Sequence, residues 1–249
     1  MTIVDHVAHV MLDRAPVNAL TPEMMAAVIA IFDEIGAARD VRAAVLTAKG
    51  RVFCAGSDVK ARKSSNHAGA EEVAYNRLAR ELTSAVADCA VPVIVGVHGP
   101  ALGGGLCLVA ASDIVVVGPD ASFALPEINV GLLGGAAWAT RLFGARWARR
   151  MMLTGATVSA GELIASGSFG AAVVADDAQQ TALEIAAALA AKSPTGVRLA
   201  KSALNDIEFM ELRAGYRHEQ TFTSRLRGHP DSQEAMAAFL ERREPRFDG

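Results

Sequence analysis

The sequence has few cysteines and no excess of one charge. Its 249 residues include three cysteines, 24 Lys and Arg residues and 27 Asp and Glu residues, giving a net charge of -3. The charges are interspersed, so the basic stripe that binds nucleic acid and the polybasic patch that binds membranes are both missing. The odd number of cysteines and their spacing fit neither a disulfide framework nor a metal site. We therefore expect a cytoplasmic protein without nucleic-acid partner or metal.

The chain also lacks a secretory signal and an uninterrupted membrane span. Asp5 and Asp13 lie where a signal peptide has its basic region and apolar run. The most apolar stretch, residues 91–112, has His98 as its only ionisable side chain apart from the thiol of Cys107, but two prolines and five glycines interrupt it. This punctuation predicts a buried strand, a tight loop and the start of a buried helix, with no membrane association.

Strands, helices and glycine-rich loops alternate over most of the chain. The hydrophobic pattern predicts strands at 3–13, 43–47, 92–97 and 114–117, and helices from Thr21 to Gly36, over 70–89 and from about 104. From about residue 179 the pattern is helical only. We therefore expect an α/β core over residues 1–190, followed by a helical segment over 191–249.

Helix starts and one apolar face are also visible in the sequence. Ser159 with Glu162 has the spacing of a capping box, and Asp231 with Glu234 places an acidic residue as the expected N-cap of the last helix. That helix carries an apolar face of Met236, Phe239 and Leu240, which we expect to pack against the core or against a neighbouring subunit.

Two glycine motifs have the composition that presents backbone N–H groups to a ligand. The first is Ala55-Gly56-Ser57 after an apolar strand, and the second is Gly103-Gly104-Gly105 before an apolar helix, whose first amides lack helical partners. Either motif alone is equally well explained by a tight turn or by close packing. Together they predict two converging donors, the arrangement of an oxyanion hole.

These motifs, followed by Pro126-Glu127, resemble the crotonase (enoyl-CoA hydratase/isomerase) superfamily, and the resemblance covers nearly the whole chain. It implies a crotonase-like ββα spiral core with a helical C-terminal segment. It also implies that the amides of Ser57 and Gly104 bind the oxygen of an acyl-coenzyme A thioester. Coenzyme A would then be part of the substrate, with no separate cofactor.

The resemblance assigns a catalytic role to Glu127. This carboxylate lies in an apolar setting, Phe123-Ala124-Leu125-Pro126, where desolvation raises a carboxyl pKa and favours a general base. A lone loop glutamate is otherwise most simply a surface residue. The position at which hydratases of the family carry a second glutamate is Cys107, which we expect to be a small side chain facing the core.

The missing second carboxylate favours an isomerase over a hydratase. Hydration uses two carboxylates, whereas a single base can move a double bond by carrying one proton from the α to the γ carbon. A 2-enoyl-CoA hydratase and a non-catalytic acyl-CoA-binding member of the superfamily remain as alternatives. The loop Gly131-Leu132-Leu133-Gly134-Gly135 also departs from the proline-containing loop of the family.

The resemblance further implies contacts with coenzyme A and with other subunits. The backbone at Ala55 and Ser57 would meet the adenine end, and Lys60 would lie near the phosphates. Phe239 and Arg242 match positions that reach the coenzyme A of an adjacent subunit in related trimers and hexamers, so we expect a homotrimer or a dimer of trimers.

Several residues have open assignments. A serine nucleophile, Ser57 activated by His98, is an alternative that would make the protein an acyl hydrolase, although the nucleophile-elbow pattern is absent and His98 is more simply a packing residue. Asn129, Trp138 and Tyr216 are candidates for shaping the acyl pocket, and the sequence does not identify the acyl chain.

Overall fold

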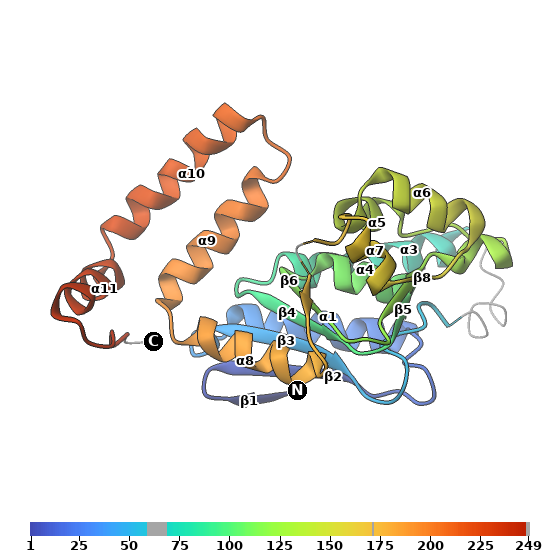
Figure 1. The fold of residues 1–249 in the computed structure, drawn as a ribbon, viewed down its shortest axis with the longest axis horizontal. Helices are drawn as coiled ribbons and strands as arrows, with labels where there is room; N and C mark the ends of the chain where they lie inside the picture. Colours follow the sequence, from blue (N-terminus) through green and yellow to red (C-terminus); the bar gives the residue numbers. More distant parts are fainter. Residues whose placement is uncertain (59–68, 171, 248–249) are drawn as a thin grey trace.

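A six-stranded sheet forms the centre of the molecule (Figure 1). The computed structural model describes residues 1–58, 69–170 and 172–247. Across the sheet the strands are β1 (Thr2–Val4), β2 (Val7–Leu12), β3 (Ala43–Ala48), β4 (Val93–Val97), β6 (Ile114–Val117) and β9 (Val173–Val174). All neighbours are parallel except β1 and β2. The residues of β3 and β4 are all buried, as expected for parallel strands covered on both faces.

The single strand predicted at 3–13 is instead a hairpin. β1 and β2 pair in antiparallel fashion with Val4 opposite Val7, and the two residues between them, Asp5 and His6, both have positive φ angles, 47° and 67°. Two positive φ angles define the tight turn whose twist matches that of paired strands. The prediction missed this turn because Asp-His is not one of its usual glycine-containing signatures.

Helices cover both faces of the sheet. On one side lie α1 (Pro22–Ala37), α3 (Ala70–Ala87) and α4 (Gly104–Ala111), which belong to the larger apolar core. On the other side lies α8 (Ala178–Ala190), whose alanines pack against the opposite residues of β2, β3, β4 and β6. A Cβ at Gly96 would lie 2.7 Å from the carbonyl oxygen of Ala178, so this glycine permits the close approach of α8 to the sheet.

A second, three-stranded sheet lies beside the first. It consists of β5 (Pro100–Leu102), β7 (Ser122–Ala124) and β8 (Val158–Ser159), in that order. The chain leaves β7 into the short 3-10 helix η1 (Pro126–Val130), then forms α5 (Ala136–Phe143) and α6 (Ala145–Thr154). After β8, α7 (Ala160–Ala165) begins with the predicted capping box: Glu162 N donates to Ser159 Oγ at 3.2 Å, and Ser159 N donates to Glu162 Oε2 at 3.1 Å.

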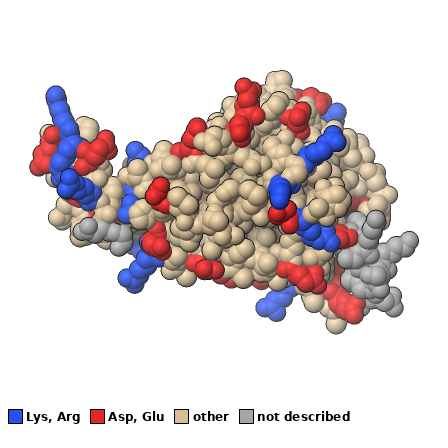
Figure 2. Space-filling view, turned by 90° about the horizontal axis from the view of Figure 1, so that it is seen from below, with Lys and Arg blue, Asp and Glu red and all other residues tan. Residues whose placement is uncertain are grey.

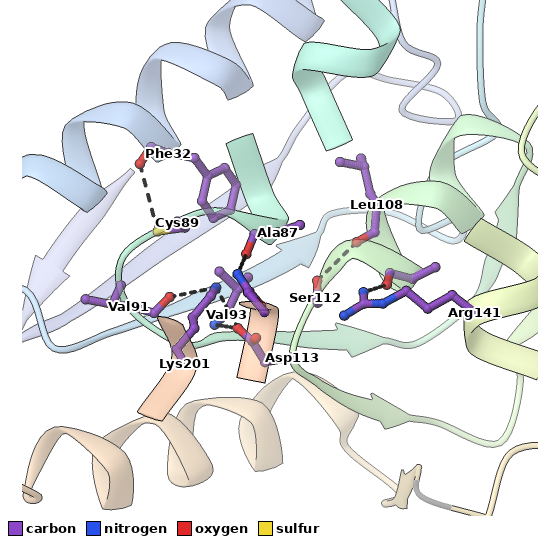
Figure 3. A network of polar contacts seen from close by, with 12 residues as sticks. Phe32, Ala87, Cys89, Val91, Val93, Leu108, Ser112, Asp113, Arg141 and Lys201 are labelled. Carbon is purple, nitrogen blue, oxygen red and sulfur yellow. Dashed lines mark hydrogen bonds and ion pairs between the residues drawn. The ribbon is translucent and has the colours of Figure 1, made fainter. Parts of the chain in front are cut away.

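Three helices, which we call the C-terminal arm, follow the core: α9 (Pro194–Ile207), α10 (Leu212–Arg227) and α11 (Pro230–Glu241). Figure 1 shows α10 and α11 extending away from the sheets. α9 is held to the core by buried polar contacts (Figure 3). The ammonium group of Lys201, 4% exposed, donates to Asp113 Oδ2 at 2.8 Å and to the carbonyl of Val91 at 3.1 Å, which fixes this helix against the ends of β4 and β6.

The structure of the arm differs from the predicted N-cap of the last helix and shows where the apolar face of that helix lies. The N-cap of α11 is His229, not Asp231, because Pro230 occupies the first helical position. The carboxylate of Asp231 instead accepts a hydrogen bond from Ser193 Oγ at 2.7 Å, which joins α11 to the start of α9. Met236, Phe239 and Leu240 are 61–79% exposed, so they do not pack against the core of their own chain.

The distribution of charged side chains on the surface agrees with the small net charge of the sequence. On the face in Figure 2, acidic and basic side chains are interspersed. Within the described part of the chain, no helix is both long and apolar enough to cross a membrane. The same residues contain no cluster of His, Cys, Asp and Glu that would hold a metal ion.

Candidate active site

A cavity of about 360 Å³ lies between α3 and the two glycine motifs. One face of α3 forms one wall, and Ser57, Gly104 and Cys107 form another. Glu127 and the loop residues Leu133 to Gly135 line it as well. The volume is within the range of small-molecule sites, and most of the remaining lining side chains are apolar.

The position of the Ser57 amide follows from the backbone pairing around it. Ser57 forms an isolated parallel bridge with Leu20: Leu20 N donates to Gly56 O at 2.8 Å, and Asp58 N donates to Leu20 O at 3.0 Å. Because its two neighbours make these bonds, the N–H of Ser57 points away from Leu20. No residue in the described ranges accepts a hydrogen bond from it.

The Gly104 amide lies next to it. Gly104 is the first residue of α4, where a backbone N–H has no partner within the helix and the helix dipole is positive. A Cβ at Gly104 would lie 3.9 Å from Ser57 N, and one at Gly56 would lie 3.2 Å from Gly104 N. The two motifs are therefore in direct contact, and both amides belong to residues that line the cavity.

Glu127 lies in the first turn of η1, directly after β7. Its Oε2 is buried, and the described residues provide no hydrogen-bond partner for it. Burial raises the pKa of its carboxyl above the ordinary value. The other oxygen, Oε1, lies so close to Gly103 that a Cβ there would be 2.1 Å from it. The glycine run therefore makes room for this carboxylate and also supplies the nearby amide of Gly104.

Cys107 lies one turn into α4 and lines the same cavity. It is 8% exposed, and burial together with the negative charge of Glu127 raises the pKa of its thiol to about 12. The thiol therefore stays protonated at neutral pH. The side chain is buried as predicted, but it also faces the site, where it provides neither a charge nor a base.

Comparisons with known proteins agree with this geometry. Residues 2–249 match the enoyl-CoA hydratase/isomerase family. The chain belongs to this family. It is 38% identical to a Mycobacterium tuberculosis protein, the (7aS)-7a-methyl-1,5-dioxo-2,3,5,6,7,7a-hexahydro-1H-indene-carboxyl-CoA hydrolase, over 94% of each chain. It is also 29% identical to the 2,3-dehydroadipyl-CoA hydratase of Escherichia coli, over 93% of this chain and 91% of the relative.

Solved structures of the family have the same fold. The crystal structure of an enoyl-CoA hydratase from Bacillus anthracis superposes with a TM-score of 0.90 at 30% identity, covering 98% of this chain and 96% of that one. The crotonase-like fold that the family resemblance implied is therefore confirmed, and the chain is a member of a family of enzymes that act on coenzyme A thioesters.

His98 has a structural role in this family member. Its Nε2 contacts the carbonyl of Gly50 at 2.8 Å, and its Nδ1 contacts the side-chain amide of Gln179 at 3.0 Å. It does not line the cavity that contains Ser57. The assignment of His98 as a packing residue is thus confirmed, and the alternative of a Ser57–His98 nucleophilic pair has no geometric support.

Of the remaining predicted site residues that the structure describes, one lines the cavity and the others do not. Trp138 lines the cavity, whereas the side chain of Asn129 packs against Gly155 and Tyr216 lies on α10. Ala55 is not a lining residue, and its N–H donates to Val17 O at 3.0 Å. Lys60 lies outside the described residues.

The C-terminal candidates are distant from the cavity of their own chain. Phe239 is 79% exposed on α11, and Arg242 forms the C-cap of that helix. No residue of the arm lines the cavity.

The contribution of α3 to the cavity is not evident from the sequence. The residues of this helix that line the cavity come from successive turns and include Tyr75, Asn76, Ala79, Arg80 and Thr83. Their spacing of three and four residues marks one helical face, but the face mixes polar and apolar side chains and so gives no amphipathic signal. Only the packing of α3 across the site shows what that face contacts.

Proposed function

We propose that this protein is a single-base enoyl-CoA isomerase, which converts a 3-enoyl thioester into its 2-enoyl isomer. The observation that supports it best is the pairing of Glu127 with Cys107. Among the described residues, Glu127 is the only carboxylate that lines the cavity, and the residue at the position of a second one is a neutral thiol.

The proposed reaction needs one base and one oxyanion site. Glu127 removes a proton from the α carbon, and the negative charge moves to the thioester oxygen, which accepts hydrogen bonds from the amides of Ser57 and Gly104. The protonated Glu127 then returns the proton to the γ carbon as the double bond shifts to the α,β position. No water is consumed, and the base is regenerated.

The test compares the rates of isomerisation and hydration for thioesters whose acyl chains have the same length. The purified protein should isomerise a 3-enoyl thioester faster than it hydrates the matching 2-enoyl thioester, because hydration uses a second acid–base group. Both products are resolved by chromatography. Hydration at a rate equal to or above isomerisation would contradict the proposal and favour a hydratase, the activity named for several relatives.

A second candidate is a hydrolase. Two relatives at 38% and 36% identity, from Mycobacterium tuberculosis and Rhodococcus jostii, are both named as hydrolases of an indene-carboxyl-CoA with two keto groups. A single carboxylate is also sufficient to deprotonate an attacking water. Uptake of one water by that bicyclic thioester, faster than any conversion of linear enoyl thioesters, would favour the hydrolase over the isomerase.

We also propose that coenzyme A binds between subunits. The backbone at Ala55 and Ser57 would meet the adenine end, Lys60 the phosphates, and Phe239 and Arg242 the coenzyme of a neighbouring subunit. The exposed apolar residues of the arm support an interface there.

This arrangement predicts the assembly state. Light scattering at micromolar concentration should give three or six times the subunit mass of 26.0 kDa, corresponding to a trimer or a dimer of trimers. A single species with the mass of one subunit would contradict the shared site and the role of Phe239 and Arg242 in it.

A further inference from the structure

One wall of the cavity carries a cation that the proposed reaction does not use. Arg80, on α3, lines the cavity together with Asn76 one turn earlier and Thr83 about one turn later. Among the lining residues in the described part of the chain, Arg80 and Glu127 are the only charged side chains, since Cys107 stays neutral. The cavity therefore has one negative and one positive group on different walls.

The charge of Arg80 is not neutralised by the protein within residues 1–58, 69–170 and 172–247. The structure shows no ion pair and no hydrogen bond of its guanidinium there. The helix positions three and four residues away are also not acidic: they are Asn76, Arg77, Thr83 and Ser84. A guanidinium that lines a ligand cavity and has no carboxylate partner among the described residues is suited to an anion brought by the ligand.

We propose that the acyl group of the substrate carries a carboxylate at the end remote from the thioester, and that Arg80 binds it. This inference rests on the proposed function for the identity of the thioester end. Glu127 would repel a second carboxylate placed near the reacting carbons, whereas Arg80 on α3 would attract it. Apolar side chains that line the same cavity, such as Leu82, Leu133 and Trp138, would cover the methylene groups of the chain.

Binding of unreactive ligands tests this without relying on turnover. Saturated acyl-CoA thioesters of several chain lengths are prepared in three forms, ending in a carboxylate, in its methyl ester or in a methyl group, and their Kd values are measured by calorimetry. At the length that spans the cavity, the carboxylate form should bind about tenfold more tightly than its methyl ester. The factor is modest because Arg80 is open to solvent, which screens the pair.

The variants Arg80→Gln and Arg77→Gln form a matched pair. Both remove one arginine from exposed positions of α3, but Arg77 does not line the cavity. Arg80→Gln should abolish the preference for the carboxylate and leave the affinity for the methyl-ended thioester unchanged. Arg77→Gln should keep the preference.

These measurements distinguish failure of the Arg80 inference from failure of the isomerase proposal. If no thioester is turned over but the carboxylate preference depends on Arg80, the isomerase proposal fails and this inference stands. Equal affinity for carboxylate and ester at every length would overturn the inference. An equal loss of affinity for free coenzyme A in Arg80→Gln would also overturn it, because Arg80 would then bind the phosphates of the coenzyme.

Discussion

Replacing Glu127 with glutamine is expected to lower kcat by about 10²–10⁴-fold or more, while the Kd of a saturated acyl-CoA changes little. The amide keeps the shape of the side chain but cannot accept a proton at neutral pH. The contacts that hold the thioester, which we place at Ser57 and Gly104, are not altered. Steady-state kinetics on the best thioester and calorimetry with its saturated analogue measure the two effects separately.

The control for this variant is Glu184→Gln. Glu184 is an exposed residue of α8, away from the cavity, and makes a hydrogen bond only to Gln180 on the same helix among the described residues. It should keep the activity of the unmodified protein. A Glu127→Gln variant that also keeps that activity would show that Glu127 is not the base.

The raised pKa of Glu127 predicts the pH dependence of the natural protein. Because the base acts when deprotonated, kcat/KM of the natural protein should rise with pH, with a midpoint above 4.5, the ordinary value for glutamate. A midpoint at or below that value would contradict the role of burial at this site.

The Glu127→Gln substitution should lower activity without lowering the stability of the fold. Burial raises the pKa of Glu127 in the folded state, so its contribution to stability is present below the unfolded pKa and is lost as the pH rises through the folded pKa. Above the folded pKa the ionised carboxylate therefore costs stability, and glutamine removes that cost. At pH values above the folded pKa, the Tm of Glu127→Gln should equal or exceed that of the natural protein, and the difference should shrink on acidification.

The local features of this site were predictable because they are written in short stretches of sequence. The motifs require glycine because a Cβ would collide with a backbone or side-chain atom, as it would at Gly56, Gly103 and Gly105. The capping box at Ser159 and Glu162 needs only neighbours three residues apart. The resemblance to a family then supplied the pairing of the two motifs, which their separation of about 50 residues does not reveal.

The features that were not predicted depend on contacts between distant segments. Lys201 and Arg198 read as ordinary helical cations, yet they donate to Asp113 and to the backbone carbonyls at the end of α1. Arg80 likewise reads as a solvated residue until α3 is placed across the cavity. Cys107 was correctly predicted to be buried, but burial alone did not show that it lines the cavity together with Glu127.

Gly103→Ala should lower kcat by about 100-fold or more without unfolding the protein. The new Cβ would lie 2.1 Å from Glu127 Oε1, which is the far end of a flexible side chain and can rotate away at small cost to stability. The carboxylate would then be displaced by about 1 Å or more, and a displacement of that size can reduce the rate about 10²-fold. Binding of a saturated acyl-CoA should persist, since the amides of Ser57 and Gly104 remain.

Gly167→Ala separates this displacement from backbone strain. Gly103 and Gly167 both have positive φ angles, 51° and 75°, so alanine strains the backbone at each, at a cost of roughly 1–3 kcal/mol. At Gly167, however, no atom lies within 4 Å of the added Cβ, and the residue does not line the active-site cavity. Both variants should therefore lose Tm, but only Gly103→Ala should lose kcat. If both retain the full rate with an intact fold, the carboxylate position beside Gly103 is not the one from which Glu127 acts.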